Sequence, residues 1–90
     1  IMTTQLTNER KFDLLSKYGL TDEEMRDNLA ESGFNDLDNE IVMCECARNM
    51  GYIWSFKLDR WLAKNRMFLD DDQEDYDALL DEVRNEEHNA

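Results

Sequence analysis

Apolar residues recur along most of the chain at spacings of three and four, which is the pattern of helices that bury one face. The first such segment covers about 8–18, where Phe12, Leu15 and Tyr18 follow one another every three residues. Gly19 comes next, at a place where helices usually end through a left-handed residue. The spacing therefore predicts a short first helix.

A second helix has the clearest boundaries. Thr21 and Glu24 form a capping box, in which each residue's side chain binds the backbone N–H of the other. The helix is expected to run to about Ser32 and to stop at Gly33. These signals predict a helix over about 21–32.

A third helix is expected after the polar cluster Asn35–Asp38, with Leu37, Ile41 and Cys44 as its apolar stripe. Gly51 either ends this helix or lies within it, at a cost of about 1 kcal/mol relative to Ala.

Residues 52–66 carry two competing patterns. Every second residue from Tyr52 onward is apolar, which is typical of a strand. Four apolar residues also fit one face of a helix: Trp54, Leu58, Trp61 and Leu62. Because a lone strand has no obvious partner elsewhere in the chain, we expect a helix here.

The last segment, from about 71 to 84, combines an acidic start with a stripe formed by Tyr76, Leu79 and Val83. Acidic residues are favourable at a helix start because of the helix dipole, and the tail is expected to fray from about 85. The chain of 90 residues has no internal repeat and no long linker. The expected fold class is therefore all-α, a single-domain bundle of four to five short helices.

The charge of the chain is the feature of its composition that bears most on function. The formal net charge is −12, with 22 Asp and Glu against 10 Lys and Arg. By segment, residues 1–47 carry −7, residues 48–67 carry +4, and residues 68–90 carry −9. A basic, aromatic segment thus lies between two acidic ones. Self-repulsion at such a net charge opposes compaction, so we expect the acidity to serve a function.

The sharpest hypothesis is mimicry of a nucleic acid, because carboxylates at helical spacing can imitate the charge density of a duplex. The chain is similar in size, acidity and lack of catalytic motifs to inhibitors that phages encode against host proteins. The main expected contacts with a nucleic-acid-binding protein are Asp70, Asp71, Asp72, Glu74, Asp77 and Asp81. The secondary contacts are Glu23, Glu24, Asp27 and Glu31.

The alternative is a transcriptional regulator or adaptor whose basic helix over about 52–66 docks on DNA or on an acidic partner. The run from Ala47 to Gly51, followed by Trp61 and Leu62, resembles a helix-turn-helix motif. The expected docking face consists of Trp54, Lys57, Arg60, Trp61 and Lys64. The same face would also suit a second copy of the chain. Direct binding to DNA is opposed by the net charge of the whole molecule.

Catalysis, metals and membranes are not expected. The acidic run from Asp70 resembles a calcium loop, but its sixth residue is Asp75 where a Gly is needed for the turn. Cys44 and Cys46 lack a nearby base, and they are too few for a zinc site. The longest apolar run has four residues, far short of a membrane span. We therefore expect a cytoplasmic binding protein without cofactors or enzymatic activity.

Overall fold

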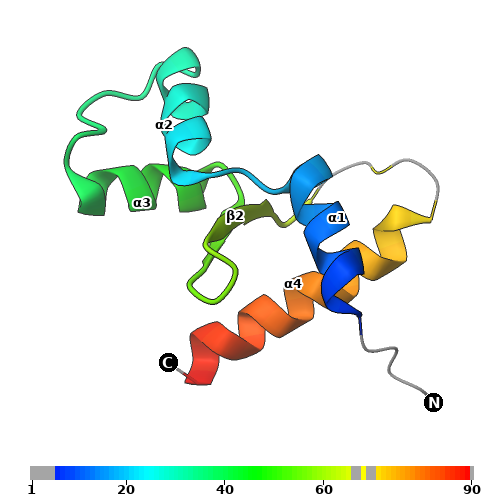
Figure 1. Ribbon diagram of the computed structural model, residues 1–90. Helices are drawn as coiled ribbons and strands as arrows, with labels where there is room; N and C mark the ends of the chain where they lie inside the picture. The colour runs from blue at the N-terminus through cyan, green and yellow to red at the C-terminus, as the bar shows by residue number, and fades with distance from the viewer. Residues whose placement is uncertain (1–5, 66–67, 69–70, 90) are drawn as a thin grey trace.

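The computed structural model describes residues 6–65, 68 and 71–89. Four helices and two strands follow one another along this part of the chain (Figure 1). Their bounds are α1 (Asn8–Tyr18), α2 (Asp22–Glu31), α3 (Glu40–Asn49), β1 (Tyr52–Ser55), β2 (Arg60–Ala63) and α4 (Asp72–Asn89). The helix α4 thus continues beyond residue 85, where the sequence predicts a frayed tail.

The prediction of an all-α bundle is wrong, because residues 52–63 form an antiparallel hairpin and not a helix. The alternation that starts at Tyr52 is a true strand signal, and the partner of this strand is the very next segment of the chain. Gly51, at φ +92°, ends α3 and lets the chain turn directly into β1. The turn then closes at Asp59, whose φ is +55° and whose N–H donates to the Ser55 carbonyl at 2.8 Å.

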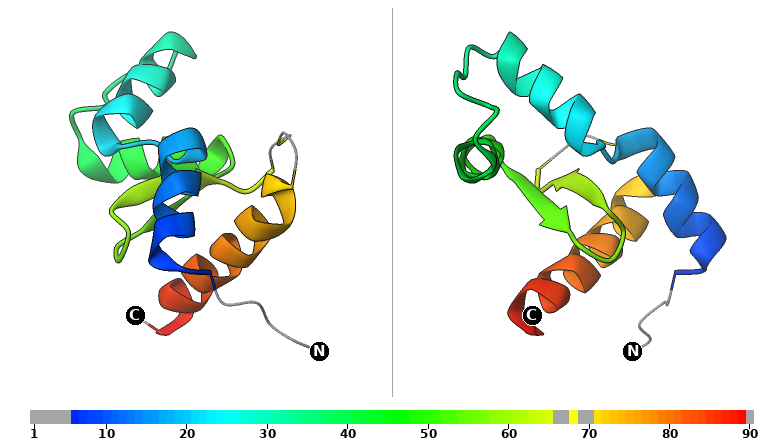
Figure 2. Two further views of the ribbon diagram at one scale, coloured as in Figure 1. Left: turned by 45° about the vertical axis from the view of Figure 1, so that its right-hand side comes forward. Right: turned by 60° about the vertical axis from the view of Figure 1, so that its left-hand side comes forward.

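The hairpin has two buried faces, which explains its mixed apolar pattern. Ile53 pairs with Leu62 across the strands, and both pack with α1 and α4. Trp54 pairs with Trp61, and both pack on the opposite side with α2 and α3. Figure 2 shows the hairpin between these two groups of helices. We call α1 with α4 the α1–α4 half, and residues 22–49, which contain α2 and α3, the α2–α3 half.

Local signals place the helix starts. The Thr21 side chain accepts from the Glu24 N–H, and the Glu24 carboxylate accepts from the Thr21 N–H, which confirms the capping box. Asn39 caps α3 with its side-chain oxygen, one residue beyond the predicted cluster.

The exit from α1 differs from the prediction. Gly19 is extended, with φ −83°, rather than left-handed. This conformation leads the chain into a short bridge, in which Leu20 and Trp61 exchange backbone hydrogen bonds of 2.9 and 2.8 Å. The bridge fixes the start of α2 against β2.

Candidate functional site

The structure shows that some of the acidic residues predicted as main contacts are buried and others are exposed. Asp70 lies outside the described residues. Asp72 is only 6% exposed, and it accepts hydrogen bonds from the Tyr18 hydroxyl at 2.6 Å and from Arg10 Nη2 at 2.7 Å. These two bonds, that from Tyr18 first, lower the pKa of Asp72 from 3.8 to about 2. Asp72 therefore holds α4 to α1 and is not available to a partner.

The cations of α1 are matched by acids in the same half. Arg10 also binds Asp75 at 2.7 Å, and its bonds to Asp75 and Asp72 raise the pKa of the guanidinium. Lys11 binds Glu82 across the helix pair at 2.8 Å. Four of the predicted main contacts remain exposed on α4 or just before it: Asp71, Glu74, Asp77 and Asp81.

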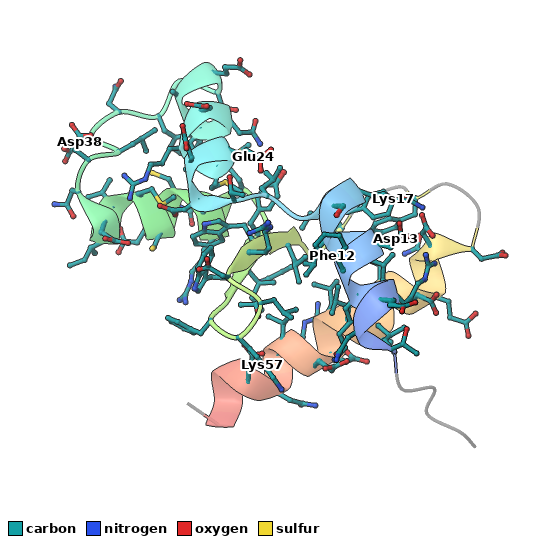
Figure 3. All side chains as sticks on the ribbon, viewed as in Figure 1. Phe12, Asp13, Lys17, Glu24, Asp38 and Lys57 are labelled. Carbon is teal, nitrogen blue, oxygen red and sulfur yellow. The ribbon has the colours of Figure 1, made fainter. Side chains whose placement is uncertain are left out.

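The secondary contacts on α2 are more open. Glu24 is exposed but serves the capping box, whose hydrogen bonds lower its pKa. Glu23, Asp27 and Glu31 are exposed, and no residue that the structure describes gives them a hydrogen bond or an ion pair. Figure 3 shows Asp38, on the loop that follows α2, pointing away from the protein.

The α2–α3 half has few cations with which to match this charge. Its sequence holds nine Asp and Glu against two Arg, a net charge of −7. Arg26 is used internally, because it binds Asp22 at 3.1 Å and donates to the Leu37 carbonyl, which fixes the loop before α3. The other arginine, Arg48, also has an interaction partner in the structure.

The alternative docking face does not form as one helix face. Trp61 is buried in β2 and Trp54 is half-buried in β1, both on the α2–α3 side. Lys57 lies at the tip of the hairpin, Arg60 is half-buried on β2, and Lys64 follows β2 (Figure 3). The aromatic and basic residues of this set therefore belong to different surfaces.

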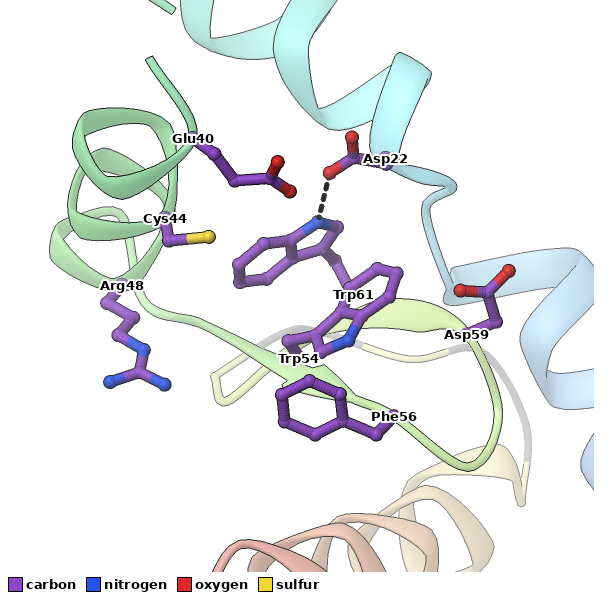
Figure 4. A pocket seen from close by; sticks show the side chains of 8 residues that line it. All are labelled: Asp22, Glu40, Cys44, Arg48, Trp54, Phe56, Asp59 and Trp61. Carbon is purple, nitrogen blue, oxygen red and sulfur yellow. Dashed lines mark hydrogen bonds between the residues drawn. The ribbon is translucent and has the colours of Figure 1, made fainter.

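The structure reveals a pocket that the sequence analysis did not predict. It has a volume of about 320 Å³ and opens between α3 and the hairpin (Figure 4). Trp54 and Trp61 form its aromatic wall, with ring centroids 5.1 Å apart. Phe56 continues this wall, edge-on to Trp54 at 6.5 Å, and it is 75% exposed. The pocket thus has an exposed aromatic side chain at its edge.

The other side of the pocket is mainly acidic. Carboxylates of Asp22 and Glu40 line it, together with Cys44 and Arg48. Asp59 lies on the hairpin, across the two indoles from Glu40 (Figure 4). Asp22 is already engaged, since it accepts from Trp61 Nε1 at 3.2 Å in addition to its bond with Arg26. This hydrogen bond holds the buried indole in place.

Cys44 lines the pocket but does not act as a reactive group. Burial, and then the nearby carboxylates of Glu40 and Asp22, raise the pKa of its thiol. The thiol therefore stays protonated at neutral pH, and the thiolate that would act as a nucleophile is scarce.

The described residues contain neither a metal site nor a membrane span. Within the described ranges, no three His, Cys, Asp or Glu side chains are grouped so that they could hold a metal ion. No helix in this part of the chain is both long and apolar enough to cross a membrane. No protein family model, curated protein or solved structure matches the chain.

Proposed function

We propose that the protein is a binding module that inhibits or regulates a nucleic-acid-binding protein by presenting its α2–α3 half to that protein's basic site. The observation that carries this proposal is the exposed row of Glu23, Asp27 and Glu31, which have no partner among the described residues. Carboxylates that stabilise the fold are expected to meet cations, as Asp72 does with Arg10. Carboxylates that meet no cation in the described part of the chain are suited to a cation of a partner protein.

The spacing of this row supports mimicry of a polyanion. Residues four apart on a helix lie about 6 Å apart along its axis and on nearly the same face. Glu23, Asp27 and Glu31 therefore place three negative charges along a rigid rod. Such a surface attracts a basic groove over long range and loses this attraction as salt increases.

Direct binding to DNA is the weaker alternative. The run from Ala47 to Gly51 resembles a helix-turn-helix motif, and the hairpin that follows it carries Lys57 and Arg60. However, the helix that this motif would place in the major groove is replaced by the hairpin, and α3 before it exposes Glu40 and Glu45. Phosphates would repel these carboxylates and the acidic α2 beside them. A protein partner therefore fits the charge distribution better.

The proposal places the protein where its partner works, in the cytoplasm of the cell that expresses it or of a host that it enters. It is tested by affinity capture from a nuclease-treated lysate of that cell, with elution by increasing salt. We expect a nucleic-acid-binding protein that moderate salt releases and that duplex DNA displaces. Recovery of nucleic acid itself, or a captured protein that duplex DNA does not displace, would contradict the proposal.

A further inference from the structure

The aromatic pocket has the chemistry of a site for a positively charged side chain. The faces of Trp rings attract cations, and the planar guanidinium of Arg also stacks on them. Trp54 and Phe56 supply the accessible rings, and the buried ring of Trp61 packs against Trp54. Two carboxylates on the pocket, those of Glu40 and Asp59, have no hydrogen-bond or ion-pair partner among the described residues. Each is a free acceptor for the N–H groups of a guanidinium at its own end of the pocket.

The pocket's size and charge narrow the choice of occupant. A volume of about 320 Å³ lies at the lower end of the range for small-molecule sites, roughly 300–1,000 Å³. The pocket therefore has room for one long side chain. Three carboxylates and one guanidinium, that of Arg48, line the pocket, and Arg48 already has an interaction partner. The lining therefore disfavours a negatively charged occupant.

We propose that this pocket receives the guanidinium of an arginine in the basic partner, against the indole of Trp54, with the carboxylates of Glu40 and Asp59 on either side of it. This inference rests on the proposed function, since it assigns an anchor for the same basic partner. Arg and Trp are the residues that most often dominate binding energy at interfaces. The exposed charges of α2 then guide the partner, and the pocket fixes the position of one of its arginines.

The pocket offers its own reporter, because both tryptophans of the chain line it. The test is a titration of tryptophan fluorescence at about 0.15 M ionic strength, where screening limits the influence of distant charges to roughly 8 Å. The probes are three blocked tripeptides, acetyl-Gly-X-Gly-amide, in which X is arginine, its neutral analogue citrulline, or leucine. We expect a saturable change with the arginine peptide and a much weaker one with the other two.

A matched pair of double variants locates the binding site. We expect Glu40→Gln with Asp59→Asn to weaken binding of the arginine peptide by roughly tenfold or more. Asparagine tolerates the positive φ of residue 59. The control, Glu74→Gln with Asp77→Asn, removes the same number of charges from the exposed side of α4, and we expect it to change the affinity less than about twofold. Circular dichroism checks that both variants are folded.

Three results would overturn the inference: equal binding of the arginine and citrulline peptides, stronger binding of the leucine peptide, or equal losses in the two double variants. These results are separate from those that test the proposed function. If duplex DNA displaces a captured partner but the arginine peptide does not bind, the pocket assignment fails and the proposed function stands. If the peptide binds but DNA does not displace the partner, the mimicry fails and the pocket assignment stands.

Discussion

The α1–α4 half and the α2–α3 half use acidic residues in opposite ways. In the α1–α4 half, the carboxylates of Asp72, Asp75 and Glu82 each meet a cation of α1. In the α2–α3 half, nine acidic residues share two arginines. Acidic residues therefore join α1 to α4 in the first half, although Asp71, Glu74, Asp77 and Asp81 stay exposed there. In the α2–α3 half, most acidic residues face outward.

The aromatic residues follow the same division. Tyr18, Phe68 and Tyr76 pack edge-on or tilted against one another in the α1–α4 half, with centroids 4.3–5.8 Å apart. On the other side of the hairpin, Trp54 and Phe56 line an open pocket. The α1–α4 half thus packs three rings against one another, although Phe12 on α1 is 71% exposed, and the other half presents two rings at a pocket. We expect binding to depend on the α2–α3 half.

The largest expected loss of stability comes from a substitution in β2, the strand that packs against both halves. Trp61→Ala removes a side chain that is 1% exposed, and we expect it to lower the free energy of unfolding by about 3–5 kcal/mol. Leu62, the next residue, packs in the other half, so unfolding is expected to stay a single transition. Urea denaturation followed by circular dichroism measures both quantities.

Phe56→Ala is the matched control, because this aromatic side chain is 75% exposed. We expect it to change the free energy of unfolding by less than about 0.5 kcal/mol. Comparable losses in the two variants, or two separate transitions in Trp61→Ala, would show that the hairpin does not join the halves as described.

The next effect concerns the matched charges. Asp72→Asn is expected to be less stable than the wild type at pH 7, because Arg10 and the Tyr18 hydroxyl lose the carboxylate to which both donate. In the wild type, the pKa of Asp72 is lowered from 3.8 to about 2. Its contribution to stability is therefore complete above about pH 4, and it is lost as the pH falls through about 2.

Urea denaturation of both proteins at pH 7, 4, 3 and 2 checks this prediction. The difference in stability between wild type and Asp72→Asn should shrink from pH 4 to pH 2. Asp77→Asn, on the exposed side of the same helix, should match the wild type throughout. A difference for Asp72→Asn that stays constant over this pH range would contradict the assigned pKa.

A smaller effect is expected at the helix caps, which are local and independent of net charge. Thr21→Ala removes the cap of α2, and Thr7→Ala removes that of α1. Each is expected to cost about 1 kcal/mol of unfolding free energy, measured by urea denaturation at pH 7. A loss in one variant and none in the other would mean that the caps do not act locally.

These effects differ in how far the sequence can predict them. The capping box of Thr21 and Glu24 was predictable because both partners lie within one helical turn. The hairpin was missed although its alternation is visible from Tyr52 onward, because the pairing strand is only four residues long and follows after a four-residue turn. The cross-strand pair Trp54–Trp61 was the signal that could have revealed it.

The candidate site was not predictable from the sequence, because it is formed by contacts between distant parts of the chain. Asp72 looks like any other acid of the run before α4, but it meets Arg10 and Tyr18, which lie more than 50 residues earlier. Likewise, the pocket combines side chains from α2, α3 and the hairpin. Spacing within one helix does not report such contacts. It did identify the row of Glu23, Asp27 and Glu31, because that row is a property of a single helix.

The smallest expected effect on stability comes from neutralising exposed acids. Two triple variants remove three charges each: Glu23→Gln, Asp27→Asn and Glu31→Gln in α2, and Asp71→Asn, Glu74→Gln and Asp77→Asn at the start of α4. We expect each triple variant to stay within about 1 kcal/mol of the wild type, because exposed charges contribute little. Urea denaturation at pH 7 checks this, and a large loss in the α2 variant would mean that its row is structural.

The same two variants give the most direct measurement of the central claim, which is that the α2–α3 half presents its unmatched charge to a basic partner. Affinity capture of the partner is compared for wild type and both variants at equal protein and salt concentrations. The account predicts that the α2 variant loses roughly tenfold or more in apparent affinity, while the α4 variant stays close to the wild type. Equal losses in both, or a loss in the α4 variant alone, would contradict it.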